Sequence, residues 1–152
     1  MTDKSHTTPD GPFALSNHRL MALTGRDAVA FAQAQFMNDV SLLGNGQWQW
    51  NGWLTPKGRV IALFALVHAA PSRFLMVLPD FPAEELAARM KRFVFRSKLS
   101  LLPLDDWHAC AGPAPSGPDR ALAAGDAGTG WVLDLSGDGA SRAAARDRVV
   151  RR

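Results

Sequence analysis

Hydrophobic and polar residues alternate most regularly from Gln47 to His68, in the stretch QWQWNGWLTPKGRVIALFALVH. A period of two divides its first part into two faces, with Trp48, Trp50, Gly52 and Leu54 on one side and Gln47, Gln49, Asn51 and Trp53 on the other. This alternation is typical of a half-buried strand. The segment from Val60 to Val67 is apolar on both faces, which predicts a strand in the middle of a sheet, covered above and below.

The residues between these two strands, Thr55-Pro56-Lys57-Gly58, predict a tight turn. Pro56 pre-sets φ for the second position of a type I turn, and Gly58 can take the positive φ that closes such a turn with a bulge. The two strands are therefore expected to form a β-hairpin.

A helix is predicted from Asp27 to Met37. Thr24 is suited to cap its N-terminus, with Asp27 placed as in a capping box. Helical spacing brings together one face that contains Ala28, Phe31, Ala32 and Gln35. Gln35 therefore points toward the core or a pocket. Two interpretations stay open, an amide satisfied by the backbone and a ligand contact.

Further strands are predicted around the hairpin. FALS and RLMAL supply short strands between Phe13 and Leu23, and Arg73 to Leu78 supplies a third apolar strand after the hairpin. Three consecutive strands with short connections favour an antiparallel meander. A last strand is expected from Lys98 to Leu102.

A second helix is predicted to begin near Asp80 and Pro82. Acidic residues occupy its first turn and basic residues its end, the order that the helix dipole favours: Glu84 and Glu85, then Lys91, Arg92 and Arg96. Its apolar face is expected to contain Leu86, Met90, Phe93 and Val94. Together the elements predict an α+β fold, an antiparallel sheet with helices packed on one side.

The pattern weakens after Pro103. Gly112 to Gly130 is rich in Ala, Gly and Pro and is interpreted as a linker or an irregular crossing segment. Trp131 to Leu135 is predicted as one more strand and Ala140 to Arg152 as a helix. We divide the chain into a disordered lead-in at residues 1–12, a domain at 13–106, and a linker with an incomplete continuation at 107–152.

The composition of the chain limits its class, its cellular compartment and its partners. The chain has 152 residues, of which 47% are hydrophobic, enough for a packed core. The single cysteine, Cys110, excludes an intrachain disulfide and fits a reducing compartment. No signal peptide and no membrane-spanning run is evident, so a cytoplasmic location without membrane association is expected. The net charge of +3 is weak evidence for a nucleic-acid partner.

Most catalytic patterns are missing. The histidines, His6, His18, His68 and His108, show no metal-ligand spacing, so no metal site is predicted. Neither a phosphate-binding glycine loop nor a nucleophile elbow is present. One stretch, from Arg89 to Lys98, has an excess of basic residues. It contains no acid and is interleaved with Phe93 and Phe95. It fits a polyanion such as RNA or the glutamate tail of a folate, or else a solvated helix face.

Several motifs resemble the N-terminal half of the YgfZ family, folate-binding proteins related to the aminomethyltransferase (T-protein) of the glycine cleavage system. They are LTGRDA at Leu23–Ala28, FAQAQFMNDV at Phe31–Val40, PKGR at Pro56–Arg59 and MKRFVFRSKL at Met90–Leu99. The resemblance implies an aminomethyltransferase-like fold, here truncated, that binds tetrahydrofolate in a central cavity. It also implies a role in iron–sulfur cluster upkeep or tRNA modification, with tRNA or iron–sulfur enzymes as partners.

The resemblance assigns folate contacts to Gln35, Asn38 and Asp39, with Trp53 and Arg59 as neighbours. The residues alone explain Asn38-Asp39 equally well as a turn after the helix. A flat pteridine that hydrogen-bonds along one edge suits amide and carboxylate groups beside a Trp face.

The sequence departs from the family in several ways, which include a shorter chain and a helix that keeps Gln35 but loses the glycine of the family's Gln-Gly-Gln. The Lys-Gly-Cys motif of the family's C-terminal half is absent, and Cys110 stands in His-Ala-Cys-Ala-Gly instead. The strand after the hairpin, which begins Gly58-Arg59-Val60, also lacks the catalytic aspartate of the aminomethyltransferases. Non-enzymatic folate binding is therefore favoured, with an aminomethyltransferase or a truncated module without a ligand as alternatives. Half of such a fold would leave an apolar face uncovered, which predicts homodimerisation or aggregation.

Overall fold

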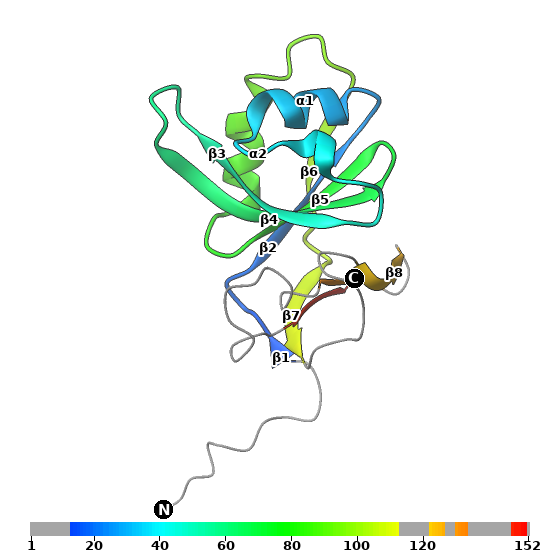
Figure 1. Cartoon of the computed structure of the whole chain (residues 1–152). Coiled ribbons are helices and arrows are strands. Elements are labelled where there is room, and N and C mark those ends of the chain that lie inside the picture. The colour runs from blue at the N-terminus through cyan, green and yellow to red at the C-terminus, as the bar shows by residue number, and fades with distance from the viewer. Residues whose placement is uncertain (1–12, 113–121, 127–129, 134–146, 152) are drawn as a thin grey trace, which may run out of the picture.

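The computed structural model describes residues 13–112, 122–126, 130–133 and 147–151. Its strands form two five-stranded sheets in which all neighbouring strands are antiparallel (Figure 1). We call the sheet with strand order β3-β4-β5-β2-β6 the central sheet, and the sheet with order β1-β7-β10-β9-β8 the second sheet.

The central sheet contains β2 (Arg19–Thr24), β3 (Trp48–Leu54), β4 (Val60–Ala70), β5 (Arg73–Leu78) and β6 (Ser100–Pro103). The second sheet contains β1 (Phe13–Ala14), β7 (His108–Gly112), β8 (Leu122–Asp126), β9 (Gly130–Leu133) and β10 (Asp147–Arg151). The helices are α1 (Ala28–Gln35), α2 (Ala83–Lys91) and the short 3-10 helix η2 (Val40–Leu42). No helix in these described ranges is long and apolar enough to cross a membrane.

The predicted hairpin is confirmed. Strands β3 and β4 pair antiparallel, with a register shift between Trp53 and Leu54. Gly58 has φ +83° and its N–H donates to the Thr55 carbonyl over 2.8 Å, as a type I turn closed by a left-handed glycine requires. The meander β3-β4-β5 follows as expected.

Both helices pack on one face of the central sheet. Phe31 of α1 and Leu86 of α2 belong to the same buried cluster as Phe64 of β4 and Met76 of β5. Figure 1 shows α1 and α2 with the central sheet in the upper half of the view and β1 and β7 below. The α+β arrangement with helices on one side of an antiparallel sheet is therefore confirmed.

The opposite face of the central sheet is covered by the second sheet. Val67 and Val77 of the central sheet are buried in one cluster with Trp107, Ala109 of β7 and Leu133 of β9. The expectation of an uncovered apolar face is therefore wrong for this face. The same packing corrects the prediction that β3 is half-buried, because Trp48 lies in this cluster while Trp53 lies in the cluster on the helical side. Homodimerisation stays a prediction.

The C-terminal part of the chain differs most from expectation. Residues 147–151, predicted as helix, form β10, which lies between β7 and β9. The segment predicted to be irregular contains β8, and the strand predicted from Trp131 is β9. The sequences of β8 and β10 show no local hydrophobic period, because these strands depend on pairing with other strands. The predicted lead-in at residues 1–12 lies outside the described residues, and the boundary at residue 106 stays a prediction.

The predicted helix ends need small corrections. Thr24 is the last residue of β2 and does not cap α1, whose N-cap is Asp27 without a side-chain capping bond. The second helix ends at Lys91. Phe93 and Val94 therefore follow the helix, and Phe93 is 41% exposed.

Candidate functional site

The segment after α1 runs along the free edge of β3. Phe36 forms an isolated antiparallel bridge with Trp53, and the Met37 N–H donates to the Gly52 carbonyl over 2.9 Å. The Asn38 side chain continues this pairing, since its Nδ2 donates to the Trp50 carbonyl over 2.7 Å. The edge of the central sheet is thereby covered by the FMND part of the resemblance motif.

Asn51 fixes this edge from inside the protein. It is 1% exposed, the one buried polar residue recorded in the described ranges. Its Oδ1 accepts hydrogen bonds from the backbone N–H of Asn38 at 2.9 Å and of Gly52 at 2.8 Å. Its Nδ2 donates to Gln49 Oε1 at 2.8 Å. The sequence analysis placed Asn51 on a polar face and missed this role. The sequence feature that could have indicated this role is a side-chain amide in a strand whose partner strand is wholly apolar.

A hollow of about 380 Å³ opens between the end of α1, the end of β3 and the turn after α2. We call it the Gln35 pocket; its lining includes Gln35, Met37, Trp53, Thr55, Ile61 and Phe93. Its volume lies at the lower end of the roughly 300–1,000 Å³ of small-molecule sites. None of its lining residues, as far as the structure describes them, is ionisable, so the pocket offers binding groups without an acid or a base.

Gln35 and Trp53 are joined across this pocket. The Trp53 indole Nε1 donates to Gln35 Oε1 over 3.2 Å. An indole N–H can only donate, so the amide oxygen must face Trp53 and the amide nitrogen must point away. That nitrogen has no hydrogen-bond partner among the residues that the structure describes. Gln35 is thus an oriented donor.

Two aromatic rings form part of the wall of the Gln35 pocket. Trp53 and Phe93 meet edge to face, with centroids 5.7 Å apart and planes at 82°. Phe93 was assigned to the apolar face of the second helix, and its place in the pocket was missed because the helix ends earlier. An aromatic corner beside an oriented amide suits a flat heteroaromatic ring that hydrogen-bonds along one edge.

Asp39 lies farther along the same chain segment and caps η2. Its Oδ1 accepts from the Ser41 hydroxyl at 2.5 Å and from the Ser41 N–H at 2.9 Å. These bonds, the hydroxyl first, hold the pKa of Asp39 below its ordinary value. The Gln33 side chain, which also hydrogen-bonds with this carboxylate, lowers the pKa of Asp39 further.

The residues assigned by resemblance therefore fall into two groups. Gln35 and Trp53 line one pocket, whereas Asn38, Asp39 and Arg59 do not line it. Arg59 is exposed, and its backbone N–H donates to the Thr55 hydroxyl, which does line the pocket, over 3.1 Å. Across the described residues, no three His, Cys, Asp or Glu side chains gather as metal ligands would.

Comparison with known proteins identifies the fold. No protein-family model matches the chain. An uncharacterized protein of Haemophilus influenzae is 33% identical over 95 residues, which are 62% of this chain and 33% of that protein. The crystal structure of glycine cleavage system aminomethyltransferase T from Bartonella henselae matches with a TM-score of 0.73 and 17% identity. The match covers 97% of this chain and 43% of that one. The aminomethyltransferase-like fold is thus shown, and the chain spans less than half the length of either protein.

Proposed function

We propose that the chain is the N-terminal, folate-binding part of a YgfZ-type protein and that the Gln35 pocket holds the pteridine of a tetrahydrofolate. The aminomethyltransferase-like fold and the resemblance motifs support this proposal. The observation that carries it is the Trp53–Gln35 hydrogen bond of 3.2 Å, which orients the amide of one pocket residue against the indole of another.

The chemistry of the pocket matches one end of a folate. A pteridine is flat and carries ring nitrogens and a carbonyl along one edge, which accept hydrogen bonds from an amide such as Gln35. Trp53 and Phe93 supply apolar contact to the ring. The pocket takes only part of such a ligand, because folates also carry a benzoyl group and a glutamate tail.

Asn38, Asp39 and Arg59 enter the proposal as contacts beyond the pteridine. Asp39 offers an exposed carboxylate as acceptor for a ring N–H, and the exposed Arg59 guanidinium suits the tail carboxylates. The roles in iron–sulfur cluster upkeep and tRNA modification, the corresponding partners and the cytoplasmic location rest on the family resemblance and are part of the same proposal.

An aminomethyltransferase is the second candidate, favoured by the fold of the Bartonella henselae enzyme. Strand β4 starts with Val60 and carries only apolar residues up to Val67. It therefore lacks the strand aspartate of those enzymes. A folate-dependent aminomethyl-transfer assay distinguishes the two candidates, since only the enzyme produces methylenetetrahydrofolate.

Calorimetric titration with 5-formyltetrahydrofolate tests the proposal. We expect a Kd in the high micromolar range, about −4 to −6 kcal/mol, because the pocket surrounds only part of the ligand. Trp53→Phe removes the N–H that orients Gln35 and should weaken binding several-fold. Trp48→Phe is the matched control, since Trp48 is buried in the cluster on the other face of the sheet.

Three results would overturn the proposal. The first is an absence of binding heat at millimolar ligand, which would favour a module without a ligand. The second is equal affinity of wild type and Trp53→Phe. The third is an equal loss in Trp48→Phe, which would place the ligand elsewhere.

A further inference from the structure

The turn after α2 holds an aromatic residue in a strained conformation. Successive N–H groups at the end of the helix bond three residues back, the last of them from Val94 to the Lys91 carbonyl at 3.2 Å. Phe95 then adopts φ +46°, and no other non-glycine residue in the described ranges has a positive φ. Phe95 lies three residues after Arg92, the C-cap of α2, in a left-handed conformation that glycine adopts more readily. A bulky residue there costs about 1–2 kcal/mol.

Burial of the ring does not compensate for this strain. The Phe95 side chain is 86% exposed, the highest value among the large hydrophobic residues that the structure describes. Strained and exposed residues of this kind gather at functional sites. The combination of strain and exposure makes Phe95 a candidate for contact with a partner.

Basic side chains outnumber acidic ones around this turn, where the Asp27 carboxylate accepts a hydrogen bond from the Lys98 backbone N–H. Arg89 pairs with Glu85 at 2.8 Å. Lys91, Arg92, Arg96 and Lys98 have no acidic side chain within ion-pair distance in the described part of the chain. These cations flank Phe95 in the sequence within one short segment, which favours an anion with several charges as the partner.

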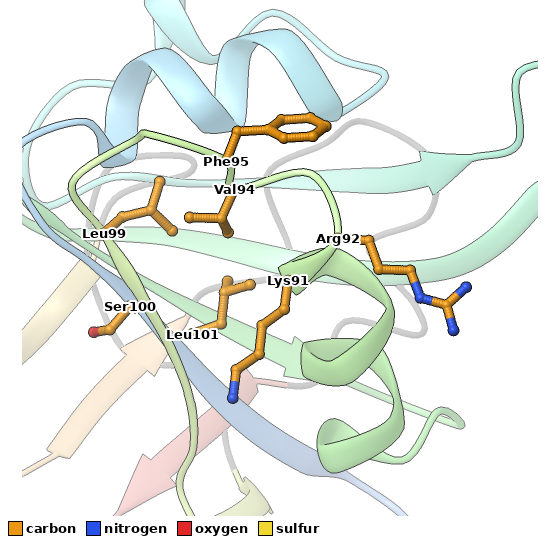
Figure 2. Close-up of a pocket in the computed structure, with 7 residues that line it drawn as sticks. All are labelled: Lys91, Arg92, Val94, Phe95, Leu99, Ser100 and Leu101. Atoms are coloured by element: carbon orange, nitrogen blue, oxygen red, sulfur yellow. The ribbon is translucent and has the colours of Figure 1, made fainter.

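The turn also contains a hollow of about 570 Å³, which we call the Phe95 pocket. Figure 2 shows Val94, Leu99 and Leu101 along its apolar middle, with the Phe95 ring at one end and the Lys91 side chain at the other. Arg92 extends away from it on the outer side of the helix end. The apolar side chains offer contact to a flat apolar group, and Lys91 offers contact to an anionic group.

We propose that the Phe95 pocket and its cations bind single-stranded nucleic acid. One unpaired base stacks on Phe95 over the apolar floor, and the phosphates on either side contact Lys91 and the outer cations Arg92, Arg96 and Lys98. Single-strand sites combine a basic track with aromatic stacking platforms in this way. An acidic peptide would satisfy the cations but has no flat group for the pocket, and a duplex keeps its bases stacked inside.

Fluorescence anisotropy with a labelled oligouridylate of about 12 nucleotides, within the site sizes of known single-strand binders, measures the interaction. A duplex RNA of the same length and a polyglutamate peptide serve as competitors. We expect the single strand to bind most tightly and its affinity to fall steeply between about 50 and 200 mM salt. Phe95→Ala should weaken binding about tenfold, the loss of one stacked base, without changing the salt slope.

Matched variants separate stacking from charge. Phe95→Trp should restore binding, whereas Leu42→Ala, at another highly exposed apolar residue, should leave it unchanged. Arg92→Gln should lower the salt slope by about one unit, and Arg19→Gln, at the end of β2 that pairs with Leu78 and not with β6, should not. Unchanged affinity in Phe95→Ala, or stronger competition by the duplex or by polyglutamate than by unlabelled single strand, would overturn the proposal.

Discussion

The Asp27 carboxylate accepts a hydrogen bond from the backbone N–H of Lys98, with Oδ2 and N 2.6 Å apart. The Asp27 N–H in turn donates to the Lys98 carbonyl over 3.2 Å. The turn before α1 is thereby fastened to the segment before β6, although the two residues are 71 positions apart in the chain. Two motifs that the sequence analysis treated separately, LTGRDA and RSKL, form one structural unit.

Replacing Asp27 tests this connection. Asp27→Ala should lower the free energy of unfolding by about 1–2 kcal/mol, the value of a charge-assisted bond at a partly exposed site. Asp27→Asn keeps an acceptor and should lose less. Arg26→Ala is the control, because Arg26 is 78% exposed and lies 3.9 Å from the carboxylate. Urea unfolding measures all three variants, and an equal loss in Arg26→Ala would contradict the assignment.

Gly25 lies in the same contact. Its φ is +145°, and a Cβ there would stand 2.3 Å from the Lys98 carbonyl oxygen. Gly58, at φ +83°, has no atom within 4 Å of its Cβ position. Gly58→Ala or Gly58→Val should therefore cost only the backbone strain, about 1 kcal/mol or somewhat more for the β-branched residue.

Gly25→Ala should lower the free energy of unfolding by at least about 2 kcal/mol more than Gly58→Ala does. The alanine at position 25 adds a collision with the backbone to a conformation that only glycine adopts readily. The melting temperatures of the two alanine variants compare the effects directly. Similar melting temperatures would show that Gly25 is not in close contact with the Lys98 backbone.

Phe95→Gly tests whether the exposed ring is strained. Glycine relieves the left-handed conformation, while its greater freedom in the unfolded chain offsets part of the gain. We expect the free energy of unfolding to rise by about 0.5–1 kcal/mol, measured by urea unfolding. A decrease would show that the ring stabilises the fold.

The sequence predicted those parts of the fold that local chemistry determines. Pro56 and Gly58 define their turn within a few residues, and Glu84 with Lys91 marks the two ends of α2. The second sheet was missed because β10 depends on pairing with β7 and β9, segments distant in sequence. Its short apolar core, Val149-Val150, resembles a marginal helix as well as a strand.

The sequence indicated only part of the candidate site, because the site also depends on contacts between residues distant in the chain. Helical spacing alone turned Gln35 inward, and the structure places it at a pocket. Its bond to Trp53 joins residues 18 positions apart, and Phe93 reaches the pocket only because α2 ends before it. No local pattern encodes either relationship. The folate assignments stay predictions for all five residues, Gln35, Asn38, Asp39, Trp53 and Arg59.

Asp39 gives a prediction for pH dependence. Its folded pKa is lowered by the Ser41 hydroxyl and then by the Ser41 backbone N–H. These bonds therefore stabilise the fold above the unfolded pKa of about 3.9, and the contribution is lost as the pH falls through the lower folded value. Ser41→Ala should make the stability less dependent on pH below about 4 than in the wild type.

Chemical unfolding at a series of pH values measures this effect. Ser72→Ala, at an exposed serine, provides the control. Parallel curves for wild type and Ser41→Ala would show that the hydroxyl does not interact with the carboxylate in solution.

The central claim, folate in the Gln35 pocket, is tested most directly by NMR of the five tryptophan indole N–H groups. Trp53→Phe identifies the Trp53 resonance. On addition of 5-formyltetrahydrofolate, the Trp53 signal should shift progressively to saturation, because its N–H holds the Gln35 amide beside the ligand. Trp48 and Trp107, buried on the other face of the central sheet, should stay in place. An unchanged Trp53 signal at saturating folate, or shifts confined to Trp48 and Trp107, would contradict the account.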